Sequence, residues 1–101
     1  MRERDVEAHL VKRVRELGGE CRKVQWIGRV GAPDRLVMLP PTVATGWGGN
    51  ECLVPTSIWV ELKAPGEKAR PSQVREHERM RAMGQRVVVI DSIDGVEELL
   101  A

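Results

Sequence analysis

A run of four β-branched residues, Val87 to Ile90, lies close behind Gly84. Such a run is typical of a strand that is buried on both faces of a sheet. The segment before it begins at Pro71, which suits the first turn of a helix, and Gly84 suits its end. Together with a strand-like stretch at 57–63, this order predicts a strand, a crossover helix and a second strand in one sheet.

The first half of the chain predicts another helix, followed by two strands. Apolar residues recur after four, four and three positions, at Val6, Leu10, Val14 and Leu17. This spacing places them on one face of a helix, with Asp5 as a suitable cap. Strands are predicted at 20–27 and 34–39. The second should end at Pro40-Pro41, because proline cannot donate to the ladder.

The predicted fold is therefore a single α/β domain over residues 1–101, with a mixed central sheet flanked by helices in the order α-β-β-β-α-β-α. Residues 40–56 are rich in glycine and proline, and we expect a long loop or a ragged hairpin insertion there. No apolar run approaches the 18 residues of a membrane span, so no membrane contact is expected. Two cysteines, Cys21 and Cys52, cannot form a disulfide scaffold, which favours a reducing intracellular setting.

The charges nearly cancel, since sixteen basic residues face fifteen acidic ones. They are unevenly distributed, because residues 87–101 hold four acids and no base. This composition excludes a protein that coats nucleic acid by bulk charge, but it allows a local basic rim. The aromatic residues are three tryptophans, with no Phe or Tyr, so an extended stacking platform for single strands is not expected. Trp47 is interpreted either as an anchor between subunits or as a cover on the sheet.

The most informative pattern joins two strand ends. Pro33-Asp34 opens one predicted strand, and Glu61-Leu62-Lys63 closes another, with 26 residues between Asp34 and Glu61. Residues two apart on a strand share a face, so Glu61 and Lys63 should project together. Pairing of the two strands would bring Asp34 beside Glu61. Two adjacent carboxylates repel each other, and Mg²⁺ is a natural compensation because it binds through one or two carboxylates.

Each half of this pattern also has a simpler interpretation. A carboxylate-x-lysine triplet alone is usually a solvated strand face, and Pro-Asp after a glycine is usually a turn. The two halves in this order, between two predicted helices, instead indicate a metal site next to a lysine that can hold a water. That combination suits phosphodiester hydrolysis. His77 is expected to be a buried histidine with its hydrogen bonds satisfied.

These residues resemble a known family. The segments Gly31-Ala32-Pro33-Asp34-Arg35 and Val60-Glu61-Leu62-Lys63, followed by Ser72-Gln73 and Gly84, resemble the VRR-NUC family of the PD-(D/E)xK nuclease superfamily. The resemblance implies a restriction-endonuclease-like fold with Asp34 and Glu61 as metal carboxylates and Lys63 as the catalytic lysine. It further implies that Glu7 and the Leu62 carbonyl approach the metal, and that the catalytic site includes a supporting glutamine, Gln73.

The resemblance also implies an activity. A standalone member of phage or bacterial type would be a Mg²⁺-dependent endonuclease, with Mn²⁺ able to substitute and no organic cofactor. It would cleave branched DNA, Holliday junctions in particular, as a homodimer in the cytoplasm of a bacterial or phage-infected host. The candidate DNA contacts are basic residues around the site and the second helix: Arg29, Arg35, Lys68, Arg70 and Arg75. Two alternatives stay open, a nucleic-acid or partner-binding module without cleavage and a nicking nuclease on linear duplex DNA.

Overall fold

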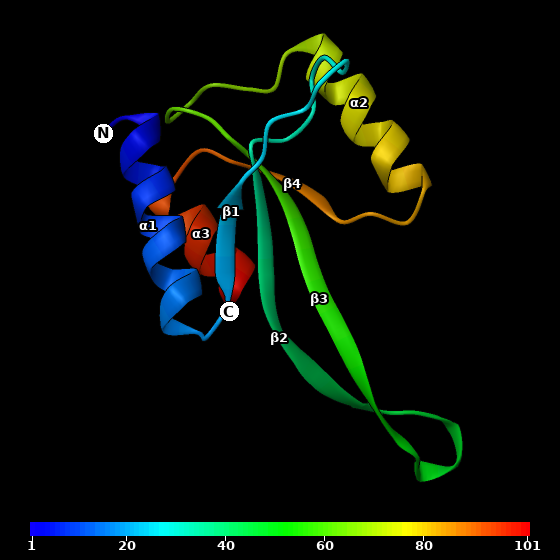
Figure 1. Ribbon diagram of the computed structural model, residues 1–101. Coiled ribbons are helices and arrows are strands. Elements are labelled where there is room, and N and C mark those ends of the chain that lie inside the picture. Colours follow the sequence, from blue (N-terminus) through cyan, green and yellow to red (C-terminus); the bar gives the residue numbers. More distant parts are fainter.

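The computed structural model describes residues 1–101 and contains one four-stranded sheet with helices on both faces (Figure 1). Strands β1, β2 and β3 pair antiparallel, and β4 pairs parallel with β3, so the sheet is mixed as predicted. The predicted α-β-β-β-α-β-α order is confirmed. The elements are α1 (Glu3–Glu16), β1 (Glu20–Lys23), β2 (Arg35–Thr45), the 3₁₀ turn η1 (Trp47–Gly49), β3 (Glu51–Leu62), α2 (Pro71–Ala82), β4 (Val87–Ile90) and α3 (Ile93–Leu100).

Helices α1 and α3 cover one face of the sheet and enclose the core. Alternate residues of β3 point toward this face, and Val6, Leu10 and Val14 of the stripe expected from the sequence are fully buried against them. Leu17, the fourth expected member, lies just beyond the end of α1 and is 41% exposed. Because successive side chains of a strand point to opposite faces, the remaining residues of β3 point to the other face of the sheet. The core residues are Val6, Leu10, Val14, Val37, Ile58, Val60, Leu62, Ile90 and Val96.

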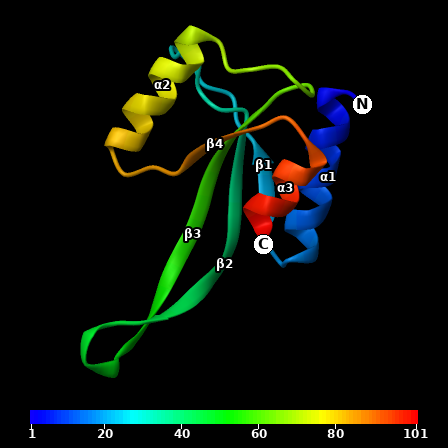
Figure 2. The ribbon, with the colours of Figure 1, turned by 180° about the vertical axis from the view of Figure 1, so that it is seen from behind.

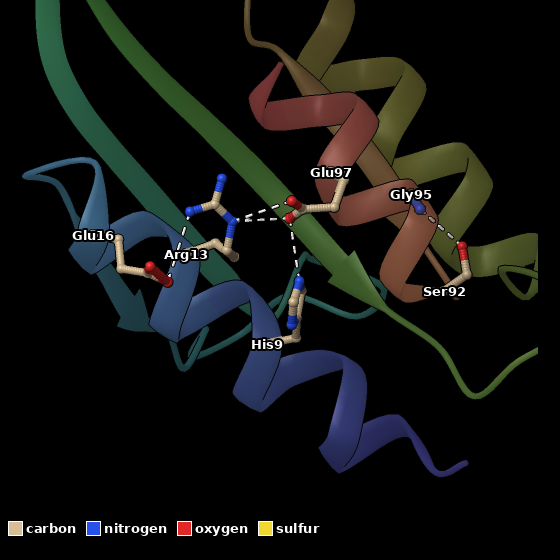
Figure 3. A network of polar contacts seen from close by, with 6 residues as sticks. All are labelled: His9, Arg13, Glu16, Ser92, Gly95 and Glu97. Atoms are coloured by element: carbon tan, nitrogen blue, oxygen red, sulfur yellow. Dashed lines mark hydrogen bonds and ion pairs between the residues drawn. The ribbon is translucent and has the colours of Figure 1, made fainter.

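A polar network joins α1 to α3 at the edge of this core (Figure 3). The carboxylate of Glu97 accepts from Arg13 Nε at 3.0 and 3.2 Å and lies 3.1 Å from His9 Nε2. Arg13 holds the pKa of Glu97 below its usual range. Ser92 caps α3, since its hydroxyl accepts from Gly95 N at 2.9 Å. These contacts fix the C-terminal helix against the first one.

Helix α2 covers the opposite face of the sheet with a polar surface. Four of its residues, Gln73, Glu76, His77 and Met80, are buried. They face the side of β3 that carries Trp59, Glu61 and Lys63. The two layers thus differ in chemistry, because one face of the sheet is an apolar core and the other encloses ionisable groups.

Residues 40–56 form the outer half of a long β2–β3 hairpin, here termed the arm, which projects away from the helices (Figures 1 and 2). The predicted strand end at Pro40-Pro41 is wrong. The register shifts between Leu39 and Thr42, and pairing then resumes at Thr42–Val54. An irregularity of this kind accommodates residues that cannot donate to the ladder.

Trp47 at the tip of the arm is 99% exposed, so the interpretation of this residue as a cover on the sheet is wrong. Two other boundaries differ from expectation: β1 ends at Lys23, and α1 begins at Glu3, where Asp5 accepts from Arg2 N at 2.7 Å. Val89 is 39% exposed, so β4 is not buried on both faces. None of the helices is both long and apolar enough to cross a membrane.

Candidate active site

Asp34 is fixed against the end of β3. Its backbone N–H donates to Val60 O at 3.1 Å, and its Oδ2 accepts from the backbone N–H of Leu62 at 3.0 Å. Its carbonyl accepts from Val24 N at 2.9 Å. These bonds place the Asp34 carboxylate next to Glu61, the residue between Val60 and Leu62, as the strand pairing predicted.

The turn before Asp34 packs closely on the start of α2. Gly31 has φ +85°, and a Cβ there would lie 2.5 Å from Ser72 O and 2.9 Å from Gln73 Cα. Only glycine suits this conformation and this approach. Gln73 is buried, and its Oε1 accepts from Arg70 N at 2.8 Å, which caps the helix. Gln73 therefore lies where the helix meets the loop that carries Asp34.

Glu61 is 2% exposed, and its Oε1 makes no hydrogen bond. Burial raises the pKa of Glu61 to about 8, and a hydrogen bond and negative charge from Asp34 act in the same direction. The positive charge of Lys63 opposes this shift, whereas the negative charge of the Glu3 carboxylate adds to it. A carboxyl group that is buried beside a second carboxylate holds its proton until a cation compensates the charge.

Lys63 lies beside Glu61 on the same face, as predicted, and is 7% exposed. Its backbone N–H donates to Ile90 O at 2.9 Å, so β4 fixes this end of β3. No carboxylate lies within 4.0 Å of its ammonium group. Lys63 is therefore a buried cation without an ion pair next to two carboxyl groups.

The side chain of His77, on α2, lies next to the carboxyl group of Glu61, on β3. Its Nε2 lies 3.6 Å from Glu61 Oε1 and makes no hydrogen bond, so the expectation of a satisfied histidine is wrong. Burial lowers the pKa of His77, and the charge of Arg81 lowers it further. The sequence placed His77 on the inward face of α2, but it gave no signal that the side chain would meet Glu61.

Glu7, expected from the resemblance to approach the metal, forms an ion pair with Arg35 at 2.9 Å. Arg35 also donates to Cys21 O at 3.3 Å and is 16% exposed, so both partners are engaged within the fold. Glu3 is the α1 acid whose charge reaches Glu61. Glu3 precedes Glu7 by one helical turn on the same face of α1. This spacing could have indicated from the sequence that Glu3 lies on the side of α1 that carries Glu7.

The other candidate DNA contacts divide into two groups. Arg29 donates to the buried Glu76 at 2.6 Å, yet its side chain is 47% exposed. The remaining three, which make no ion pair, are exposed on the loop before α2 and on α2 itself: Lys68, Arg70 and Arg75.

The residues at the end of β3 fit a small divalent cation. No group of three or more His, Cys, Asp or Glu side chains is arranged to hold a metal by itself. Mg²⁺ does not need one, because it keeps several waters and binds through one or two carboxylates. The unpaired Glu61 Oε1 beside Asp34 offers such a pair, with the Leu62 peptide adjacent.

Fold and site together define a small α/β nuclease-type domain, and comparisons with known proteins agree. No family model matches the chain. It is 47% identical over 94 residues to "Putative nuclease p44" of Acyrthosiphon pisum secondary endosymbiont phage 1, covering 93% of this chain and 87% of that protein. A solved structure described as a VRR_NUC domain matches with a TM-score of 0.77 and 37% identity, over 97% of this chain and 92% of the other. The chain belongs to the VRR-NUC nuclease family.

Proposed function

We propose that this chain is a divalent-metal-dependent, structure-selective DNA endonuclease that cleaves Holliday junctions as a homodimer. The observation that carries the proposal is the pair of adjacent carboxyl groups, the partly buried Asp34 and the buried Glu61, with the buried Lys63 beside them. Membership of a nuclease family, together with the name of the phage relative, supports phosphodiester hydrolysis.

The positions of these residues support the roles that the family resemblance implies. Mg²⁺, or Mn²⁺ in its place, would be held by Asp34 and Glu61 with the Leu62 carbonyl, and would stabilise negative charge on the phosphate. The Lys63 ammonium lies beside these groups and holds the attacking water in line with the phosphorus. The water oxygen bonds to phosphorus as one of its protons passes to solvent, and the bond to the leaving sugar oxygen breaks. The leaving oxygen takes up a proton from solvent to become a hydroxyl group.

A dimer suits a junction because two symmetric nicks need two identical sites of opposed polarity, which a two-fold axis supplies. The arm offers a surface for this contact. Val43, Trp47 and Leu53 are all more than 60% exposed, and Glu51 is the single charged residue between Pro40 and Thr56. An apolar, nearly uncharged strand pair is better suited to a second protein chain than to phosphates. Lys68, Arg70 and Arg75 instead supply exposed phosphate contacts.

The first test measures cleavage of a four-way junction in Mg²⁺ by Asp34→Asn and Lys63→Gln variants. Asp34→Asn keeps the size of its side chain and Lys63→Gln shortens it by about one bond, while both remove the charge that the proposal needs. We expect a rate loss of at least about a hundredfold. Lys12→Gln is the matched control, because Lys12 is exposed on α1 and makes no ion pair. Cutting at the wild-type rate by either site variant would overturn the assignment.

Two further measurements separate the alternatives. A binding module without cleavage would show no change in melting temperature with millimolar Mg²⁺ or Mn²⁺, whereas a cation site stabilises the fold by mass action. A panel of four-way, flap, nicked and linear duplexes of the same sequence distinguishes a junction enzyme from a nicking nuclease. We expect the highest cleavage rate on the four-way junction. A rate on linear duplex equal to that on the junction would favour the nicking enzyme.

A further inference from the structure

A cavity of about 490 Å³ lies between β3, α2 and the loop before β2. Its apolar wall consists of Trp26, Trp59, Met80 and Met83, and we term it the tryptophan pocket. Two of the three tryptophans of the chain therefore meet at one place, although they are 33 residues apart in the sequence. None of the catalytic roles above uses this pocket.

The two indole rings are held in fixed positions. Their centroids are 5.1 Å apart and the ring planes are inclined by 52°. Trp26 Nε1 donates to Pro33 O at 3.0 Å, and Trp59 Nε1 donates to Gln85 Oε1 at 2.9 Å. Each ring is half-buried, with its polar nitrogen already satisfied. The rings thus offer the pocket preformed apolar faces, which suits a flat aromatic ligand.

The rim of the pocket carries both hydrogen-bond acceptors and donors. Glu76 Oε1 accepts from Arg29 at 2.6 Å and from Arg79 at 3.0 Å, whereas its Oε2 makes no hydrogen bond within the chain. Arg29 lowers the pKa of Glu76, so the group is an ionised acceptor. The amide nitrogen of Gln85 is available as a donor, because its oxygen is occupied by Trp59. Nucleobase edges present the complementary set of amines and ring acceptors.

The pocket adjoins the active site. Trp59 precedes Glu61 by two residues on the same face of β3, about 7 Å along the strand. Glu76 precedes His77, which lies 3.6 Å from Glu61. Trp26 is bonded to Pro33, the residue before Asp34. Adjacent nucleotides of one DNA strand are several ångströms apart, so a base in the pocket would belong to a nucleotide close to the one whose phosphate lies at the active site.

Charge at the rim favours nucleic acid over an apolar peptide. Arg29 lines the pocket, and Arg79, outside the lining, bonds to the same Glu76 carboxylate. The two arginines outnumber this single carboxylate, so the cluster carries a net positive charge. Both arginine side chains are about half exposed, at 47% and 58%. A guanidinium that is fixed by one carboxylate and open to solvent on its other side can still contact a phosphodiester.

We propose that the tryptophan pocket binds one unpaired nucleobase of the strand that is cut, next to the phosphate at the active site. The inference rests on the proposed function, since it assumes that DNA occupies the site. Branched DNA supplies unpaired or easily unpaired bases, and their extrusion costs least where pairing is already disturbed. The pocket would then contribute to the preference for branched over linear DNA.

The test is a binding measurement without cleavage, in EDTA. In a Trp47→Leu background the two pocket tryptophans are the only ones left, so their fluorescence reports on the pocket. We titrate a short oligothymidylate against an abasic strand of the same length and charge. We expect saturable quenching by oligothymidylate, with affinity about tenfold higher than for the abasic strand. Equal behaviour of the two strands, or no quenching by either, would overturn the assignment.

Two variants show whether the signal comes from this pocket. Met83→Glu places a negative charge on the rim at a residue that is 69% exposed, so the fold should survive. We expect it to abolish the preference for oligothymidylate, whereas Leu17→Glu, which is 41% exposed on the far side of the sheet, should leave it unchanged. A preference unaffected by Met83→Glu would contradict the proposal. The cleavage assay with Mg²⁺ tests the nuclease assignment separately. A protein that shows the quenching preference in EDTA but cuts no DNA with Mg²⁺ would support the pocket and refute the nuclease assignment, so failure of one proposal can be distinguished from failure of the other.

Discussion

Glu61 Oε1 lies 3.6 Å from His77 Nε2, and neither atom makes a hydrogen bond within the chain. Burial acts on the two groups in opposite directions, since it raises the pKa of Glu61 to about 8 and lowers that of His77. Both side chains are therefore uncharged near neutral pH in the metal-free protein. The Glu61–His77 contact between β3 and α2 therefore carries no charge, and we infer that a cation must displace the Glu61 proton to bind.

The raised pKa of Glu61 predicts how stability depends on pH. Between about pH 6.5 and 8 the folded chain holds a proton on Glu61 that the unfolded chain has released. The folded state binds more protons, so the free energy of unfolding falls as pH rises, by at most about 1.4 kcal/mol per pH unit. His77, with its lowered pKa, acts below this window. Urea unfolding in EDTA at several pH values measures the slope.

The Glu61→Gln variant should flatten this slope, because it carries no titrating proton. Glu51→Gln, at the tip of the arm, is the matched control and should keep the wild-type slope. A wild-type protein whose stability rises across the same window would show that Glu61 is ionised in the metal-free fold.

Local geometry explains why the centre of the site could be predicted from the sequence. Strand alternation alone places Glu61 and Lys63 on one face, and pairing of their strand with the one that follows Asp34 brings the two carboxylates together. The arm could not be predicted in the same way. Proline is expected to end a strand because it has no N–H to donate to the next strand. Pro40-Pro41 lies where the register between β2 and β3 shifts, and pairing resumes after the shift.

The surroundings of the site depend on tertiary placement, which the sequence pattern does not contain. Glu3 and Glu7 share one helix face, and which of them reaches Glu61 depends on where the end of α1 meets the sheet. Similarly, the inward position of His77 follows from helical spacing, but its contact with Glu61 depends on the register between α2 and β3. Trp26 and Trp59 meet only because the loop before β2 folds back onto β3.

The two acids of α1 should behave differently when they are neutralised. Glu7→Gln breaks the ion pair with the largely buried Arg35, so we expect it to cost about 1–3 kcal/mol of stability. Glu3→Gln removes a charge that raises the pKa of Glu61, so this pKa should fall while stability changes little. Thermal melts with and without Mg²⁺ measure the change in stability, and urea unfolding in EDTA at several pH values measures the fall in the pKa of Glu61. Glu7 would be assigned to the metal, as the family resemblance implied, if Glu7→Gln abolished the Mg²⁺ response and Glu3→Gln did not.

The arm should control the oligomeric state. Replacing Trp47 and Leu53 together by serine removes two large side chains that are 99% and 68% exposed, so the fold should keep its stability. We expect light scattering to give twice the 11.3 kDa mass of one chain for the wild type and a single chain for the double variant. Leu17→Ser, at the end of α1, is the control. A monomeric wild type, or a double variant that stays dimeric, would contradict this role.

Gly31 should be essential for the position of Asp34. Gly31→Ala introduces a Cβ 2.5 Å from Ser72 O at φ +85°, so both backbone strain and a collision with the backbone of α2 oppose it. Gly28→Ala is a matched control, because Gly28 has φ +77° but nothing within 4 Å of the added atom. Strain alone costs about 1–2 kcal/mol, which we expect for Gly28→Ala, and Gly31→Ala should cost clearly more. Urea unfolding measures the difference, and junction cleavage should fall only for Gly31→Ala, since the loop that carries Asp34 must move away from α2. Equal losses of stability in the two variants would mean that the close contact between this loop and α2 does not exist in solution.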